Sequence, residues 1–177
     1  MAGIISLGLA SMACGGGQSS APDDASPTPG PTRPPGSGNP SGFTYKGVNH
    51  VSWWTDDYQS SNGVAARAAL AAAPFNWAGV LVTWYMETRA SNTIAALAAS
   101  PTSDAVRTAV ADLRGRGVKV MLKPHVDVRD GTWRGQIGPQ NPAVWFQSYR
   151  AFILQWARFA QDNGVEMLCI GTELVTM

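Results

Sequence analysis

Hydrophobic residues recur along the chain in two kinds of pattern, and the two kinds alternate. Apolar, partly β-branched runs are typical of strands in a buried parallel sheet, and they occupy residues 43–54, 77–86, 118–127 and 165–170. Between them lie stretches that are rich in alanine or carry apolar side chains at helical spacing, at residues 63–73, 103–116 and 142–163. This alternation predicts right-handed β-α-β units and a parallel sheet.

Two fold classes begin with this order of elements, the doubly wound sheet and the (β/α)₈ barrel. No glycine-rich GxGxxG or GKS/GKT loop follows the first strand, which removes the usual phosphate-binding reason for a doubly wound fold. Polar and aromatic residues instead follow every strand, and in a barrel those strand ends meet on one face. We therefore predict an α/β fold, the N-terminal half of a (β/α)₈ TIM barrel with about four β-α units, truncated after the fourth strand.

The residues before the first strand have a different composition. An apolar run at 2–13 ends in Ser-Met-Ala-Cys-Gly, which is typical of a lipoprotein signal peptide over residues 1–14 with Cys14 as the lipidated residue; a chance apolar leader is the alternative. Residues 15–42 are Gly, Ser, Pro and Thr with few apolar side chains, and predict a disordered linker. The folded domain is then expected over 43–177, outside the cytoplasm, with a lipid anchor as its only membrane contact.

Composition and charge remove several classes of function. The formal net charge of the 177-residue chain is +1, so no large basic or acidic field is available to attract nucleic acid. The two cysteines, Cys14 and Cys169, belong to different segments, and a disulfide between them is not expected. The two histidines, His50 and His125, also lie apart, with no CxxC motif or Cys/His cluster, so we predict neither a metal site nor a cofactor.

Three sequence segments carry a family resemblance. The opening KGVNHVSWW, the segment VKVMLKPHVDV and the segment LCIGTEL together resemble the N-terminal half of a retaining glycoside hydrolase of the large (β/α)₈ clan. They most resemble glycoside hydrolase family 113, whose characterised members are β-mannanases, over about residues 43–177. The resemblance implies that Glu173, at the end of the fourth strand, is the general acid/base. It also implies a nucleophilic Glu at the end of the seventh strand, to which no residue of this sequence corresponds.

The residues at the strand ends suit this chemistry. A retaining glycosidase needs two carboxyl groups about 5 Å apart, one of them protonated. We expect the rim of an apolar strand to raise the pKa of Glu173, although a helix cap or an ion pair would be a purely structural role for it. Trp133 could also supply a flat aromatic face for a sugar ring. The residues predicted to bind substrate are Asn49, His50, Trp53, Trp54, Trp84, His125, Asp127 and Arg129.

Structural alternatives remain for several of these side chains. One alternative is that His125 and Asp127 pair with Arg129 for structural reasons alone, and another is that one of Trp53 and Trp54 lies in the core. The leading interpretation is a β-mannanase-like retaining glycoside hydrolase that acts on a polysaccharide or oligosaccharide and is inactive without its nucleophile. The alternatives are a non-catalytic carbohydrate-binding lipoprotein and a (β/α)₈ enzyme of another reaction class.

Overall fold

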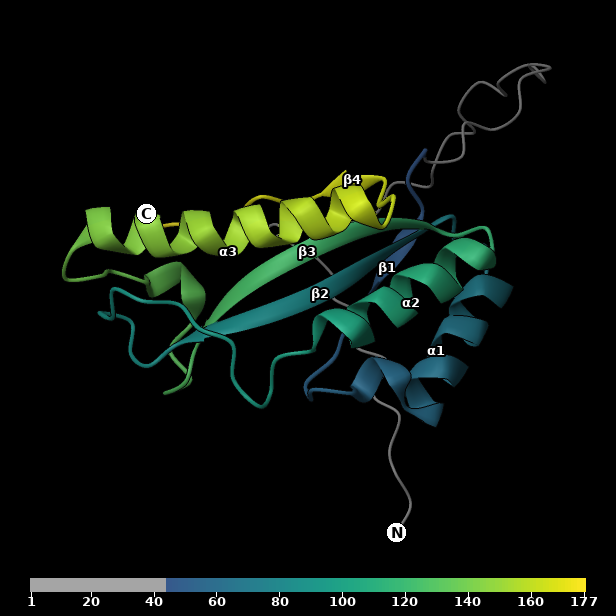
Figure 1. Ribbon diagram of the computed structural model, residues 1–177, viewed down its shortest axis with the longest axis horizontal. Helices are drawn as coiled ribbons and strands as arrows, with labels where there is room; N and C mark the ends of the chain where they lie inside the picture. The colour runs from purple at the N-terminus through teal and green to yellow at the C-terminus, as the bar shows by residue number, and fades with distance from the viewer. Residues whose placement is uncertain (1–43) are drawn as a thin grey trace, which may run out of the picture. The chain divides into compact units, whose positions relative to one another are not determined.

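A parallel sheet forms the centre of the folded domain (Figure 1). The computed structural model describes residues 44–177. The sheet has the order β1-β2-β3-β4, with bounds Gly47–His50, Trp77–Met86, Lys119–Val128 and Met167–Leu168. This confirms the predicted order of strands, although β4 is shorter than the apolar run that predicted it. The predicted signal peptide with Cys14, and the linker at 15–42, lie outside the described residues.

Helices connect the strands as predicted. They are α1 at Ser61–Ala72, α2 at Ser103–Gly115 and α3 at Pro142–Asp162, with 3₁₀ turns η1 at Asp57–Gln59 and η2 at Arg134–Gln136. A side-chain oxygen caps the first turn of each α-helix, from Ser60, Thr102 and Asn141 respectively, which satisfies a backbone N–H that the helix itself leaves free. Among residues 44–177, no helix has both the length and the apolar character to cross a membrane.

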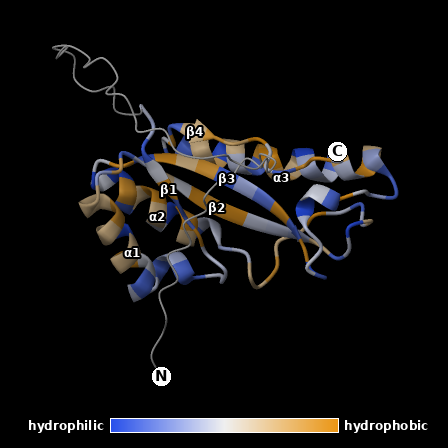
Figure 2. Ribbon diagram, turned by 180° about the vertical axis from the view of Figure 1, so that it is seen from behind, coloured by the Kyte–Doolittle hydropathy of each residue, from blue (hydrophilic) through white to orange (hydrophobic). Residues whose placement is uncertain are grey.

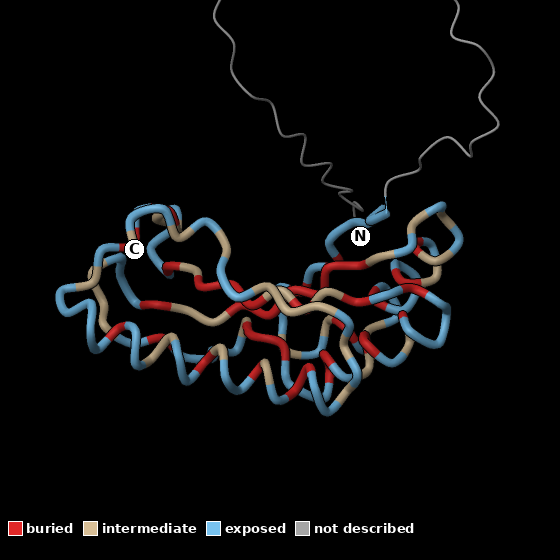
Figure 3. The backbone as a smooth tube through the Cα atoms, turned by 90° about the horizontal axis from the view of Figure 1, so that it is seen from above, coloured by how far each residue is buried: buried red, intermediate tan, exposed pale blue. Residues whose placement is uncertain are grey.

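The two faces of the sheet differ because side chains alternate along a strand. Most even-numbered residues of β2 and β3 are buried, among them the fully buried Val80, Val82 and Leu122, and they belong to one core with residues of α2 and α3. This is the helix-covered face, and Figure 3 shows the buried residues gathered between the strands and the helices. Both strands also alternate between orange and paler or blue segments in Figure 2.

The opposite side, which we call the open face, carries the odd-numbered residues 79–85 of β2 and 121–127 of β3. The register of the two strands places these residues in rows: Thr83 lies beside His125, and Tyr85 lies beside Asp127. Asn49 of β1 belongs to an earlier row, beside Gly79 and Met121. The open face corresponds to the interior of a closed barrel, where such rows form layers of side chains.

Candidate active site

Glu173 lies just beyond the fourth strand, in a segment anchored to its neighbours. The backbone N–H of Cys169 donates to the carbonyl of Leu122 at 2.9 Å, and the Tyr149 hydroxyl donates to the carbonyl of Ile170 at 2.7 Å. Glu173 itself has a φ of 56°, which makes it the one non-glycine residue of the described part with a left-handed backbone. Such a conformation is unfavourable for most side chains and is found where neighbouring contacts hold it.

The Glu173 carboxylate accepts a hydrogen bond from the Trp133 indole N–H, with Nε1 and Oε2 2.9 Å apart. This bond is the largest cause that lowers the pKa of Glu173; burial opposes it with a smaller effect, and the positive charges of Arg134 and Lys123 lower the pKa further. The rise in pKa expected from an apolar strand end is therefore not found. The carboxyl is exposed and receives a hydrogen bond, so its charged form is favoured.

Beside Glu173, three side chains form one polar unit. The Arg134 guanidinium donates to Nδ1 of His125 through Nη1, and its Nη2 lies 2.5 Å from Oδ1 of Asp127. His125 is only 7% exposed, and burial, then the charges of Arg134 and Lys123, lower its pKa to about 4. We call Glu173, Trp133, Arg134, His125 and Asp127 the rim cluster.

Arg129 does not belong to the rim cluster. Its Nη1 lies 2.6 Å from Oε2 of Glu87, in an ion pair that joins the ends of β3 and β2 on the surface. The arginine that pairs with Asp127 and His125 is thus Arg134. The expectation that Arg129 pairs with these two residues is wrong. The exposed pair contributes little to stability because water screens both charges.

Asn49 lies in β1, in an earlier row than the rim cluster, and Trp53 and Trp54 follow that strand. Asn49 packs over Gly79, where any side chain would collide with its amide, in the row that contains Met121. Met121 lies four residues before His125, roughly 13 Å along an extended strand. Trp53 and Trp54 are 50% and 66% exposed, so neither lies in the core.

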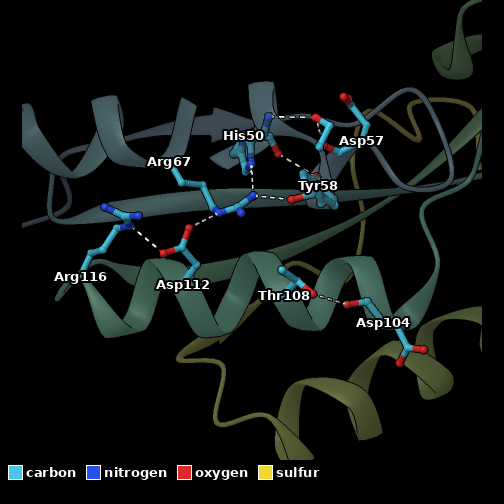
Figure 4. Close-up of polar contacts among 10 residues, drawn as sticks. His50, Asp57, Tyr58, Arg67, Asp104, Thr108, Asp112 and Arg116 are labelled. Carbon is cyan, nitrogen blue, oxygen red and sulfur yellow. Dashed lines mark hydrogen bonds and ion pairs between the residues drawn. The ribbon is translucent and has the colours of Figure 1, made fainter. Parts of the chain in front are cut away.

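His50 and Trp84 lie on the helix-covered face. Trp84 is an even-numbered residue of β2, and His50 is in register with the even-numbered Val80. The His50 side chain is buried, and its Nε2 accepts from Nη1 of Arg67 at 3.3 Å (Figure 4). Burial, followed by the charge of Arg67, lowers the pKa of His50 to about 4. Trp84 packs against Phe152 of α3, with ring centroids 4.9 Å apart. The structure therefore does not bring either residue to Glu173.

Two residues near the rim cluster were missed by the sequence analysis. Arg134 lies in η2, in a loop without periodic signal, and nothing in the sequence marked it. Tyr85 lies beside Asp127 in the sheet, and burial and the charge of Asp127 raise its pKa. The sheet register pairs Tyr85 directly with Asp127, and the sequence alone does not give this register. Within residues 44–177, no group of three or more His, Cys, Asp or Glu side chains is placed to hold a metal ion.

The parallel strands, the helices on one face and the carboxylate after the fourth strand define part of a (β/α)₈ barrel. The sequence model of Glycoside Hydrolase Family 113 matches residues 45–177, and the chain belongs to that family. No curated protein sequence matches the chain significantly.

Solved structures agree with the family assignment. The chain is similar to the GH113 β-mannanase AaManA from Alicyclobacillus acidocaldarius in complex with ManMIm, with 30% identity and a TM-score of 0.70. Two structures of GH113 β-1,4-mannanase match at 23% and 24% identity, each with a TM-score of 0.67, and support the fold alone. The matches cover 74% to 75% of this chain but only 45% to 46% of those chains. The chain thus spans less than half the length of these relatives.

Proposed function

We propose that this chain supplies the acid/base half of a retaining glycoside hydrolase that acts on β-mannan polysaccharides or oligosaccharides. The observation that carries the proposal is the place of Glu173, after the fourth strand and hydrogen-bonded to Trp133. Family membership and the likeness to a β-mannanase support the substrate class. In this role Glu173 donates a proton to the leaving glycosidic oxygen and later takes one from water.

The lowered pKa of Glu173 sets a condition on this role. A general acid must be protonated near the working pH, and a second carboxylate about 5 Å away raises the pKa of its neighbour by like-charge repulsion. Asp127, the other carboxylate of the rim cluster, is already paired with Arg134. We therefore propose that the chain alone does not hydrolyse glycosides. Hydrolysis of mannooligosaccharides by the purified chain, abolished by Glu173→Gln, would refute this part of the proposal.

A test of the acid/base role needs the second half of the barrel. The chain can be co-expressed with the C-terminal half of the β-mannanase from Alicyclobacillus acidocaldarius, and the mixed barrel assayed on mannooligosaccharides. We expect hydrolysis that Glu173→Gln removes and Glu166→Gln preserves, since Glu166 pairs with Arg114 at the other end of β4. Activity that survives Glu173→Gln in this mixed barrel would exclude Glu173 as the acid/base.

Non-catalytic carbohydrate binding is the second candidate function, and the ionised state of Glu173 favours it. Flat aromatic faces stack on sugar rings, and Trp133 is 53% exposed beside Glu173. Titration with β-1,4-mannotriose, followed through the Trp133 indole N–H signal in NMR, tests binding without catalysis. Binding by the chain with no hydrolysis by the mixed barrel would favour this candidate, with xylotriose as the control sugar.

The location of the chain is also a proposal. The pattern of residues 1–14, ending at Cys14, and the Gly, Ser and Pro content of residues 15–42 support a lipid-anchored protein outside the cytoplasm. This arrangement suits an enzyme or binding protein for polysaccharides, which are too large to enter a cell intact.

A further inference from the structure

The rim cluster contains a histidine with one ring nitrogen engaged and the other free. Nδ1 of His125 contacts Nη1 of Arg134, while Nε2 is buried and has no hydrogen-bond partner among residues 44–177. An arginine is always protonated and can only donate hydrogen bonds, so Nδ1 must be the acceptor. In a neutral ring the proton then resides on Nε2.

We infer that Arg134 is a positioning residue that holds His125 as the Nε2–H tautomer, which makes His125 a neutral hydrogen-bond donor on the open face. The group that it serves is an oxygen acceptor, either a hydroxyl of a bound sugar or an ordered water. The sugar as acceptor rests on the proposed function. The tautomer does not, because it follows from contacts within the chain.

The geometry of Arg134 explains why a single side chain can fix the tautomer of His125. Its Nη2 pairs with Asp127 Oδ1 at 2.5 Å while Nη1 faces His125, so the planar guanidinium is held at two points. The Arg134 and Asp127 side chains are 16% and 22% exposed, which shields their charges from water. Lysine has no second nitrogen, and it cannot bridge Asp127 and His125 with the same fixed geometry.

Burial and the neighbouring positive charges keep the His125 ring neutral. Burial, Arg134 and Lys123 lower the pKa of His125 to about 4, and the opposing effect of Glu173 is smaller. At neutral pH the ring therefore carries a single proton, and Arg134 determines its place. A buried donor without an acceptor is unfavourable, so Nε2–H is expected to gain an oxygen partner when the site is occupied or hydrated.

The chain provides an internal contrast, since it has two histidines. Nε2 of His50 faces Nη1 of Arg67 at 3.3 Å, so that ring accepts at Nε2 and carries its proton on Nδ1. Long-range ¹H–¹⁵N NMR of the ¹⁵N-labelled chain at neutral pH distinguishes the two tautomers. We expect one histidine of each kind, with His125 as the Nε2–H form. An Nδ1–H or charged His125 in the unaltered chain overturns the inference, whatever the variants do.

Two variants then separate positioning from general structure. Arg134→Met removes the donor, and we expect His125 to become a mixture of tautomers while His50 stays unchanged, which also shows that the fold is intact. Arg129→Met is the matched control, because it removes a nearby arginine that pairs with Glu87, and it should leave His125 as Nε2–H. If His125 keeps its tautomer in folded Arg134→Met, the inference is wrong.

Addition of β-1,4-mannotriose to the unaltered chain identifies the acceptor. A sugar hydroxyl as acceptor predicts that the His125 Nε2–H signal shifts on titration, whereas a water acceptor predicts no shift. Failure to bind mannotriose counts against the proposed function alone, because the tautomer is measured in the free chain.

Discussion

Trp133 and Glu173 are forty positions apart in the sequence, yet the indole N–H of one donates to the carboxylate of the other at 2.9 Å. The bond joins the loop after β3 to the segment after β4. A second contact supports the same connection, because the Thr176 hydroxyl lies 3.2 Å from the carbonyl oxygen of Gly135. The loop after β3 therefore supplies the largest cause of the lowered pKa of the candidate acid.

Replacement of Trp133 by Phe tests this control directly. The variant keeps an aromatic face and removes the N–H, so the largest cause of the lowered pKa of Glu173 is lost. We expect the pKa of Glu173 to rise, as measured by ¹³C NMR titration of the Glu side-chain carboxyls, with Glu173→Gln used for assignment. Trp53→Phe is the control, and an unchanged Glu173 titration in Trp133→Phe would contradict the prediction.

Replacement of Arg67 by Met should be among the most destabilising changes in the domain. Arg67 is fully buried, and it bonds to Asp112 at 2.6 Å and to the carbonyl of Tyr58 at 2.7 Å (Figure 4). Its loss leaves the Tyr58 carbonyl without this donor and leaves Asp112 with Arg116 as its remaining partner, so we expect a cost of about 3 kcal/mol of unfolding free energy, the low end for a broken buried pair. Urea unfolding measures this difference.

Arg107→Met is the matched control for Arg67→Met. Arg107 pairs with Asp104 one helical turn away, and both side chains are more than half exposed. Surface pairs of this kind contribute about 0–1 kcal/mol, so this variant should unfold close to the unaltered chain. Equal losses for the two arginines would show that burial of Arg67 does not determine its contribution.

The apolar runs were sufficient to predict the sheet, because a parallel strand buried on both faces leaves a continuous hydrophobic signal. The same continuity hides which residue points to which face. His50 and Trp84 were therefore grouped with residues of the open face, although each points toward the helices. A shift of one residue exchanges the faces, and only the register of the sheet resolves it.

The rim cluster was predictable only in part. Glu173, His125 and Asp127 end or follow strands, where the fold determines their position. Arg134 lies in a 3₁₀ turn within the loop between β3 and α3, and its approach to His125 depends on the loop conformation. The pKa of Glu173 depends on a loop tryptophan in the same way. Neither contact produces a periodic pattern in the sequence.

Replacement of Cys14 by Ala tests the proposed lipid anchor. A lipidated cysteine holds a protein at a membrane because each buried CH₂ group of the acyl chain contributes about 0.8 kcal/mol. We expect the unaltered chain, expressed in a bacterium, to incorporate labelled palmitate and sediment with membranes, and Cys14→Ala to do neither. Cys169→Ala should retain the label. Labelling that persists without Cys14 would rule out this residue as the attachment site.

The two histidines predict how stability changes with pH. The pKa of each is lowered from 6.5 to about 4 in the folded chain. Between these pH values the unfolded chain binds protons that the folded chain does not. The free energy of unfolding is therefore highest above about pH 6.5 and falls as the pH decreases toward 4. At pH 5 each histidine is expected to have removed about 2 kcal/mol of unfolding free energy.

Urea unfolding at pH 7.5 and pH 5 measures the loss, and His125→Asn separates the two contributions. Asparagine keeps a polar side chain but does not titrate, so the difference between the two pH values should be about half as large in the variant. The remaining half belongs to His50, whose ring is buried beside Arg67. An equal loss in the variant and in the unaltered chain would show that His125 is protonated as readily in the folded state as in the unfolded one. His125 would then not be the neutral donor that its contact with Arg134 implies.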